Sequence, residues 1–422
     1  MKLSLKQIRR TVFTIFLIVI SLSVGYWSGT HRIEIEKQKA KSKIEIINKT
    51  SPQGKELDFS LFWEVWDKLE QKYLQKDKLD QEKMFYGAIQ GMTAALGDPY
   101  TAFLPPEENK QVKDDLNGSF EGVGIRLGFN KDKRLVVVAP LKGMPAEAAG
   151  VQAGDLILHL KDDAKGLDED TLDMSLPEAV EKIRGDKGAK LTLTLLHEGE
   201  SEPYEVEIAR ETILVPSVEV VFLNSKSEED EANPRFVHLK LTSFGDRTSD
   251  EWDQAIAEIK NQKSKIKGLI LDVRGNPGGY LRGAVNLSSE FLTKGVVVKQ
   301  EDYRGETETY SVNRRGELLD IAMVVLIDKG SASASEIVAG ALQDHDRAKL
   351  VGETSFGKGT IQEAEDVGNN SALHITTAKW LTPNGTWVNE VGLKPDFEIK
   401  NDKDKPEEDK QLEKALEILL KS

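Results

Sequence analysis

An apolar strand that runs into a turn rich in small hydroxyl residues is the feature that most constrains how this chain can fold. Residues 321–327 read IAMVVLI, a continuous apolar run that predicts a strand buried on both faces. A turn at 328–330 and the stretch SASASE at 331–336 follow, and then a helical pattern begins. A strand that leads into a helix in this way is typical of layered α/β folds, whose sites lie in the loops at the strand ends.

The region around this strand alternates between strand and helix patterns. Apolar runs predict strands and apolar spacings of three and four predict helices, in the order strand 235–241, helix 250–260, strand 268–273, helix 282–291 and strand 296–299. Late strands are predicted at 372–381 and 386–388. We therefore predict a layered α/β domain over residues 213–400. A charged linker and a terminal amphipathic helix, which makes a docking or dimer contact, are predicted within residues 401–422.

Two other regions precede this domain. Residues 117–212 contain five or six short strand patterns and two short helical ones, which indicates a small, partly open barrel. Near its start, Gly122, Val123, Gly124 and Ile125 offer backbone N–H groups for a peptide carboxylate beside an unpaired strand edge. Residues 58–116 carry large apolar side chains three and four positions apart, which predicts a helical region with an aromatic core.

The N-terminus has the pattern of a membrane signal. Residues 1–10 hold two lysines and two arginines, and residues 11–29 are mostly apolar. This order predicts a cytoplasmic start, a single-pass signal anchor or transmembrane helix in the cytoplasmic (inner) membrane, and a body on the extracytoplasmic, periplasmic side. A cleaved signal peptide is the alternative, although no Ala-x-Ala-like site follows. Residues 30–57 are charged and predict a linker.

Composition excludes several kinds of site. The sequence has 57 Lys and Arg against 71 Asp and Glu, a formal net charge of −14, and no long basic stripe, so we do not expect nucleic-acid binding. Cysteine is absent, which excludes disulfides, thiolate metal ligands and cysteine nucleophiles. The sequence contains neither a His-Glu-x-x-His motif nor paired histidines, so we expect no metal site, and no cofactor is implied.

Two familiar catalytic patterns fail in detail. Residues 352–358 fit the first seven positions of a phosphate-binding loop, but Gly359 stands where a Ser or Thr must hold magnesium, and Thr360 begins a strand pattern. His345 is the histidine nearest to the small hydroxyl residues, but no Gly-x-Ser-x-Gly elbow occurs. Its position at a helix C-terminus is favoured by the helix dipole in any case. Nucleotide hydrolysis and a Ser-His-acid triad are therefore disfavoured.

A serine–lysine dyad fits the sequence better. Ser331, Ser333 and Ser335 are the candidate nucleophiles, and the residues alone do not choose among them. Lys358 lies in a glycine-rich loop, where burial would lower its pKa from about 10.4 and leave a neutral amine that acts as a base. In an extended chain Gln362 would share a face with Lys358 and could orient its amine. An ordinary loop lysine is the alternative.

Five motifs, taken together, identify a family that the chain resembles. They are residues 97–104 (GDPYTAFL), 118–125 (GSFEGVGI), 272–279 (DVRGNPGG), 330–336 (GSASASE) and 352–360 (GETSFGKGT). The chain resembles the carboxy-terminal processing peptidases, also called tail-specific proteases, over nearly all of residues 58–400. This resemblance implies an α/β crotonase-like (ClpP/crotonase-type) serine protease core with an inserted PDZ domain at 117–212.

The resemblance also assigns roles to single residues. It implies Ser333 as nucleophile, Lys358 as base and Gln362 as its support. It implies an oxyanion hole formed by the backbone N–H groups of Gly279 and Ala334, at a glycine and at a helix N-terminus, where such groups are accessible. The structural alternative for Ser333 is a helix cap paired with Glu336, as in a capping box.

Partners follow from the same resemblance. The PDZ domain would capture protein substrates with apolar C-terminal tails, and Arg184 is the candidate for a regulatory link to the catalytic face. An adaptor protein and a homo-oligomer are further expected partners. The membrane is another, predicted from the basic and apolar pattern of the N-terminus rather than from the resemblance. The alternative function is a catalytically silent PDZ scaffold that presents tails to a partner protease. Such a scaffold would be expected to have lost Ser333 or Lys358, and both residues are present.

Overall fold

The computed structural model describes residues 58–421, except residues 198, 226, 227, 403, 404, 406 and 407. The chain divides into two compact units, residues 1–87 and 88–422. The predicted segments 1–10, 11–29 and 30–57, which include the signal anchor, lie outside the described residues. Among the helices that are described, none is long and apolar enough to cross a membrane.

The described part of the first unit is helical, as predicted. It contains α2 (Ser60–Lys72), a single 3₁₀ turn, η1 (Lys76–Lys78), and the beginning of α3 (Gln81–Ala94). The predicted aromatic core is only partly formed, because Trp66 is the one buried residue of α2. Trp63 lies edge-on to both Phe62 and Trp66, with ring centroids 4.9 Å and 6.2 Å apart.

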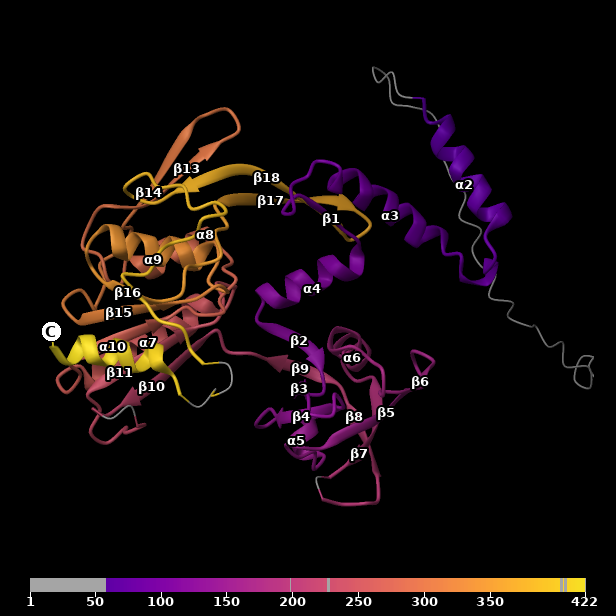
Figure 1. Cartoon of the computed structure of the whole chain (residues 1–422), viewed down its shortest axis with the longest axis horizontal. Helices are drawn as coiled ribbons and strands as arrows, with labels where there is room; N and C mark the ends of the chain where they lie inside the picture. The colour runs from indigo at the N-terminus through magenta and orange to yellow at the C-terminus, as the bar shows by residue number, and fades with distance from the viewer. Residues whose placement is uncertain (1–57, 198, 226–227, 403–404, 406–407, 422) are drawn as a thin grey trace, which may run out of the picture. The chain divides into compact units, whose positions relative to one another are not determined.

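The second unit contains a six-stranded sheet. In spatial order its strands are β10 (Val218–Leu223), β11 (Phe236–Leu241), β12 (Gly268–Asp272), β15 (Ala322–Ile327), β16 (Lys349–Gly352) and β19 (Phe397–Glu398). Figure 1 labels β10, β11, β15 and β16 of this sheet. All neighbouring strands are parallel except β10 and β11. The predicted strands at 268–273 and 321–327 are thus confirmed as parallel neighbours, and their continuous apolar runs reflect burial on both faces of the sheet.

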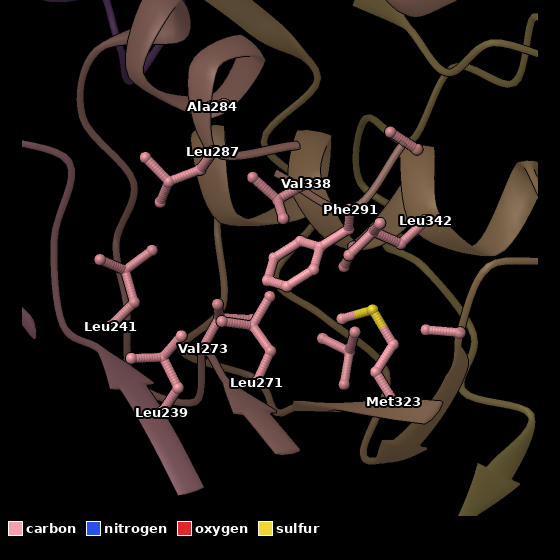
Figure 2. Packing of buried hydrophobic residues seen from close by; sticks show 14 of the residues in the cluster. Leu239, Leu241, Leu271, Val273, Ala284, Leu287, Phe291, Met323, Val338 and Leu342 are labelled. Carbon is pink, nitrogen blue, oxygen red and sulfur yellow. The ribbon is translucent and has the colours of Figure 1, made fainter. Parts of the chain in front are cut away.

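Three helices pack on one face of this sheet. They are α7 (Thr248–Gln262), α8 (Leu281–Ser288) and α9 (Ala334–Asp344). Side chains alternate along a strand, so every second strand residue points to this face. Figure 2 shows the resulting contact between strand residues and residues on or next to the helices: Leu239, Leu241, Leu271, Val273, Ala284, Leu287, Phe291, Val338 and Leu342.

The opposite face is covered by α10 (Lys410–Lys421), the last helix of the chain. The buried contacts join Ala415, Leu416 and Leu419 to Ile270, Val324 and Leu326. Arg274, just after β12, donates two hydrogen bonds of 2.9 Å to the carboxylate of Asp409, just before the helix. The predicted terminal amphipathic helix is therefore confirmed, and it docks on the protein's own core.

A second sheet lies in the same unit. It consists of β1 (Ala102–Leu104), β13 (Val296–Asp302), β14 (Thr307–Ser311), β17 (Thr360–Gly368) and β18 (Ser371–Leu381). β1 pairs with β18, so that Ala102 lies opposite His374, and α4 (Pro106–Leu116) follows it. The all-helical prediction for 58–116 is therefore wrong at β1. This strand is three residues long and precedes two prolines, and it forms only because β18 supplies a partner far along the chain.

Residues 119–214 form the small β domain that the sequence predicted. A strand pair, β2 (Ser119–Gly122) with β9 (Glu211–Leu214), stands where the chain enters and leaves it. The main sheet contains β3 (Ile125–Phe129), β4 (Leu135–Pro140), β5 (Leu156–Asp162), β7 (Lys190–Leu196) and β8 (Tyr204–Ala209), with β6 (Leu167–Asp170) beside β5. Its helices are α5 (Pro145–Ala148) and α6 (Leu176–Ile183).

A buried ion pair fixes one end of α6. Arg210 and Asp162 are fully buried and 2.7 Å apart. The Nε of Arg210 also donates to the carbonyl of Ile183 at 2.8 Å, so the guanidinium satisfies the C-terminal end of the helix, where a positive charge is favoured. Lys165 donates to the carbonyls of Lys182 and Arg184 at the same end, so two basic side chains hold the C-terminus of α6.

We predict that Leu416→Ala lowers the free energy of unfolding by about 2–5 kcal/mol, because Leu416 is 3% exposed between α10 and the sheet and its truncation leaves a cavity. Leu420→Ala is the matched control: its side chain is 48% exposed, and the change should cost less than about 0.5 kcal/mol. Denaturant unfolding measures both, and equal losses would show that α10 does not dock on the sheet.

Candidate active site

The turn between β15 and α9 holds Ser333 in an unusual backbone conformation. Its φ is +55° and its ψ is −114°, a combination that a residue with a side chain rarely adopts. Such strain persists only where surrounding contacts enforce it, and it is concentrated at functional sites. Ser333 is also only partly buried.

The other two serines of the turn have structural roles. Ser331 and Ser335 are fully buried. The hydroxyl of Ser331 donates to the carbonyl of Val273 at 2.7 Å, and that of Ser335 donates to the carbonyl of Ala332 at 2.7 Å. Among the three candidates that the sequence left open, Ser333 is therefore the one that is partly exposed and whose hydroxyl donates no hydrogen bond to a carbonyl of the turn; its side chain instead takes part in the capping box of α9.

The buried carboxylate of Glu336 joins the serine turn to the loop of Lys358. Glu336 lies in the first turn of α9 and is fully buried. One oxygen accepts the backbone N–H groups of Ser333 at 2.8 Å and of Lys358 at 2.9 Å. The other accepts the hydroxyl of Ser355 at 2.6 Å and the N–H of Gly357 at 2.8 Å. The predicted pairing of Ser333 with Glu336 is present, and it extends to the lysine loop.

Lys358 is partly buried, and burial lowers the pKa of its amine below the ordinary lysine value. The negative charges of Asp98 and Glu336 oppose this effect, but burial dominates. The amine nitrogen lies 4.8 Å from the centroid of the Tyr100 ring. Within the described residues it makes no hydrogen bond to Ser333 or Gln362; such bonds often form only when substrate is bound.

The loop after β18 supports the backbone on either side of Lys358. The indole of Trp387 donates to the carbonyl of Gly359 at 2.9 Å, and the N–H of Glu390 donates to the carbonyl of Gly357 at 2.8 Å. The indole of Trp380 donates to the carbonyl of Lys358 itself at 2.8 Å. The strand predicted at 386–388 is wrong, because Trp387 packs here as part of a loop.

Gln362 lies on β17, four residues after Lys358. Its amide nitrogen donates to the hydroxyls of Thr360 and Thr376, both at 3.0 Å. The pairing of β17 with β18 shifts register between Ile361 and Gln362, so the simple alternation assumed from the sequence is interrupted. The side chain is nonetheless held in one orientation by the two threonines.

The glycine turn after β12 lies against the serine turn. A Cβ atom on Gly278 would come within 2.8 Å of the Ser333 Cβ and 2.9 Å of the Ala334 nitrogen, so this position admits no side chain. Gly279 has a φ of +136° and contacts the backbone of Phe244 too closely for a side chain as well. The structure thus brings the predicted oxyanion residues Gly279 and Ala334 to neighbouring turns.

The predicted peptide loop lies at the start of β3, which forms one edge of its sheet. The carbonyls of Val123 and Gly124 accept the N–H groups of Ala146 and Leu141, respectively, both at 2.9 Å. The segment that contains these two donors therefore holds the loop in place. Ile125 begins β3, and Gly122 ends β2.

Arg184 follows α6 and contacts the connection that leads into this domain. Its guanidinium lies 4.5 Å from the ring centroid of Phe120 and 4.0 Å from Asp115. His345 is occupied elsewhere: its ring binds the carbonyl of Val296 at 2.7 Å. Thr360 begins strand β17, as predicted, so the lysine loop does not open a helix as a phosphate-binding loop must.

Comparison with known proteins assigns the chain to a family. Residues 235–399 match peptidase family S41, residues 111–196 match the PDZ domain, and residues 18–108 match the N-terminal domain of the activating protease CtpB. The chain is 33% identical over 376 residues to carboxy-terminal processing protease CtpB of Bacillus subtilis (strain 168), covering 89% of this chain and 74% of that protein. The chain belongs to the carboxy-terminal processing proteases.

Other carboxy-terminal processing proteases show the same relationship. The protein of that name from Bartonella bacilliformis (strain ATCC 35685 / KC583 / Herrer 020/F12,63) is 36% identical over 342 residues, with 80% of this chain and 74% of that protein covered. A solved structure from Bacteroides fragilis NCTC 9343 assigned to the S41 proteases has a TM-score of 0.55 at 15% identity, covering 88% of this chain and 99% of that chain. At 15% identity, the similarity to the Bacteroides fragilis structure is evidence for the fold of this chain and not for its function. The family is serine-type, and the chain has its protease fold and a PDZ domain.

We predict that Glu336→Gln lowers kcat on the order of a hundredfold, because an amide offers only one acceptor oxygen and its NH₂ group would face backbone donors, which displaces the serine and lysine loops. The lost pairing should also lower the free energy of unfolding by about 1–3 kcal/mol. Glu353→Gln, on the nearby acid that is 3.7 Å from Lys329, is the matched control and should leave kcat unchanged. Equal kcat in wild type and Glu336→Gln would contradict this role.

Proposed function

We propose that this carboxy-terminal processing protease is a serine endopeptidase that cleaves peptide bonds with a Ser333–Lys358 dyad and takes its substrates by their C-terminal tails. The observation that carries the proposal is the shared carboxylate of Glu336, which binds the backbone of a strained, accessible serine and of a partly buried lysine. The parallel sheet with its layer of helices further supports a crotonase-like (ClpP/crotonase-type) core.

The proposed chemistry begins with neutral Lys358. Its amine takes the proton of the Ser333 hydroxyl, and the serine oxygen attacks the scissile carbonyl carbon. The resulting ammonium then gives a proton to the leaving amine as the peptide C–N bond breaks, which leaves an ester on Ser333. Lys358 next deprotonates a water molecule that hydrolyses this ester. Gln362, fixed by two threonines, is proposed to orient the lysine amine.

Negative charge develops on the carbonyl oxygen during the attack. We assign its stabilisation to the backbone N–H groups of Gly279 and Ala334. Two features support this assignment: the glycine turn lies against Ser333 too closely for any side chain, and Ala334 is the first residue of α9, where the helix dipole favours an anion.

The PDZ domain is proposed to capture the substrate. Its loop Gly122–Ile125 would bind the terminal carboxylate, the edge of β3 would pair with the tail, and apolar final side chains would lie between β3 and α6. Arg184, which contacts Phe120 and Asp115 at the entrance to the domain, is proposed as the regulatory link toward the protease core.

The cellular setting is proposed from the sequence. Residues 11–29 would anchor the chain in the cytoplasmic membrane, with the catalytic body on the extracytoplasmic side. An adaptor protein and a homo-oligomer are the other proposed partners. No cofactor takes part in the proposed reaction.

We predict that kcat/KM for a tailed reporter protein rises with pH through the apparent pKa of Lys358, because only the neutral amine accepts the serine proton. The midpoint should lie below the ordinary lysine value of about 10.4, since burial lowers this pKa. Ser333→Ala and Lys358→Ala should each abolish cleavage.

Lys329→Ala is the matched control for the lysine, because Lys329 is highly exposed in the turn that precedes the serines. It should cleave at the wild-type rate with the same pH profile. If Ser333→Ala and Lys358→Ala both cleave the reporter as well as wild-type protein does, the dyad is wrong. If wild-type protein binds the tailed reporter without cleaving it, the PDZ scaffold is favoured.

We predict that amidation of the reporter's C-terminal carboxylate raises KM roughly tenfold or more with little change in kcat, since hydrogen bonds to a charged group contribute about 1.5–3 kcal/mol. Steady-state kinetics of paired reporters that differ only in this group measure the effect. An unchanged KM would show that the tail carboxylate is not recognised.

A further inference from the structure

The turn formed by residues 98–101, defined here as the Asp98 turn, is not used by the mechanism above. It lies between α3 and β1. The carboxylate of Asp98 accepts the N–H of Tyr100 at 3.0 Å and the hydroxyl of Thr101 at 2.7 Å. Aspartate favours such local turns because its side chain replaces a backbone acceptor. These two hydrogen bonds within the turn fix the conformation of the backbone that carries Tyr100.

The Asp98 turn is attached to β18, whose residue Thr376 also binds the side chain of Gln362. Thr101 is buried, and its hydroxyl oxygen accepts the N–H of Thr376 at 3.0 Å. The hydroxyl of Thr376 in turn accepts the amide of Gln362 at 3.0 Å. The next residue after the turn begins β1, which pairs with β18. One residue, Thr376, thus connects the turn to the predicted support of the lysine.

The turn presents the ring of Tyr100 to Lys358. The lysine nitrogen lies 4.8 Å from the ring centroid, within the roughly 6 Å over which a ring face attracts a cation. Tyr100 is only partly exposed, so part of the competing hydration is removed. A ring face binds an ammonium but offers little to a neutral amine, and the proposed reaction converts one into the other.

We propose that Tyr100 is a positioning residue for Lys358: its ring face fixes the place of the amine and stabilises the ammonium that forms when Ser333 gives up its proton. This inference rests on the proposed function, because it takes Lys358 as the base. It also means that the catalytic domain is completed by a turn that comes before the PDZ domain in the chain.

The charged and titratable groups around Lys358 come from several elements. Asp98 belongs to the same turn, Glu336 to α9 and His374 to β18. Asp98 and Glu336 favour the ammonium, and burial disfavours it. Burial, and next the charge of Lys358, lower the pKa of His374 below its ordinary value. Burial, and then the negative charges of Glu336, Asp98 and Glu390, raise the pKa of Tyr100 itself. Because all of these groups remain in a Tyr100 variant, a change at the ring reports the ring's own contribution.

The test replaces Tyr100 with phenylalanine, leucine and pentafluorophenylalanine. Phenylalanine keeps the ring face, leucine removes it, and the fluorinated ring keeps the shape but reverses the charge distribution of the face. The fluorinated variant preserves packing, so it remains informative if Tyr100→Leu does not fold. Tyr303→Leu, at a ring that is 77% exposed, is the control for loss of a tyrosine.

Two measurements are made on each variant over a range of pH. One is cleavage of the tailed reporter. The other is the rate at which an amine-selective acylating reagent modifies Lys358, read by mass spectrometry of its peptide, which reports the titration of the amine without any need for activity. Ser333→Ala in the reporter assay establishes whether cleavage is by the proposed serine.

Loss of the ring face should move the titration midpoint of Lys358 down by about half a pH unit and lower kcat roughly tenfold with KM little changed. Phenylalanine should behave nearly as wild type, and Tyr303→Leu should show no change. An unmoved midpoint in the leucine and fluorinated variants, or an equal loss with phenylalanine, would overturn the inference. If wild-type protein does not cleave but the midpoint moves as expected, the proposed function fails and the contact between Tyr100 and Lys358 stands.

Discussion

The carboxylate of Glu336 is the interaction on which the geometry of the site depends. A buried charge is costly unless it is fully hydrogen-bonded, and this one accepts four donors from two segments of the chain. Its position in the first turn of α9 adds the favourable field of the helix N-terminus. The donors include the backbone N–H groups of both Ser333 and Lys358. If the two loops separated, the carboxylate of Glu336 would be exposed to solvent or would remain buried without these hydrogen bonds.

Close backbone approach is the second requirement of the site. The glycine turn after β12, the serine turn after β15 and the lysine loop after β16 all follow neighbouring parallel strands, so they meet at one end of the sheet. Side chains at Gly278 or Gly279 would push the first two turns apart. The architecture of the sheet thus determines which loops meet, and the glycines determine how closely they do so.

The sequence predicted the elements whose signal is local. Continuous apolar runs gave β12 and β15, and apolar spacing gave α9 and α10. It could not choose among Ser331, Ser333 and Ser335, because the difference lies in the carbonyls of Val273 and Ala332 that bind the other two hydroxyls. The family resemblance chose Ser333, and its geometry in the structure is consistent with that choice.

The elements that the sequence missed depend on partners far along the chain. β1 is too short to show a pattern of its own, and the predicted strand at 386–388 is instead a loop held by the indole of Trp387. The contact between Tyr100 and Lys358 joins residues 258 positions apart (358 − 100), so no spacing rule could have indicated it. Only the motif at 97–104 marked this turn, without indicating what it does.

The paired strands β2 and β9 have a consequence for how this architecture can change. The N–H of Val215 donates to the carbonyl of Gly118 at 2.9 Å, so the chain leaves and returns at adjacent points. Neither the six-stranded sheet nor the sheet that contains β1 and β18 takes a strand from residues 119–214. The PDZ domain is therefore an insertion whose two ends lie side by side. Its length, and even its fold, can change through evolution with little entropic cost, because the ends of the inserted segment are already close together. Such changes leave β1 and β10 in place in the two sheets.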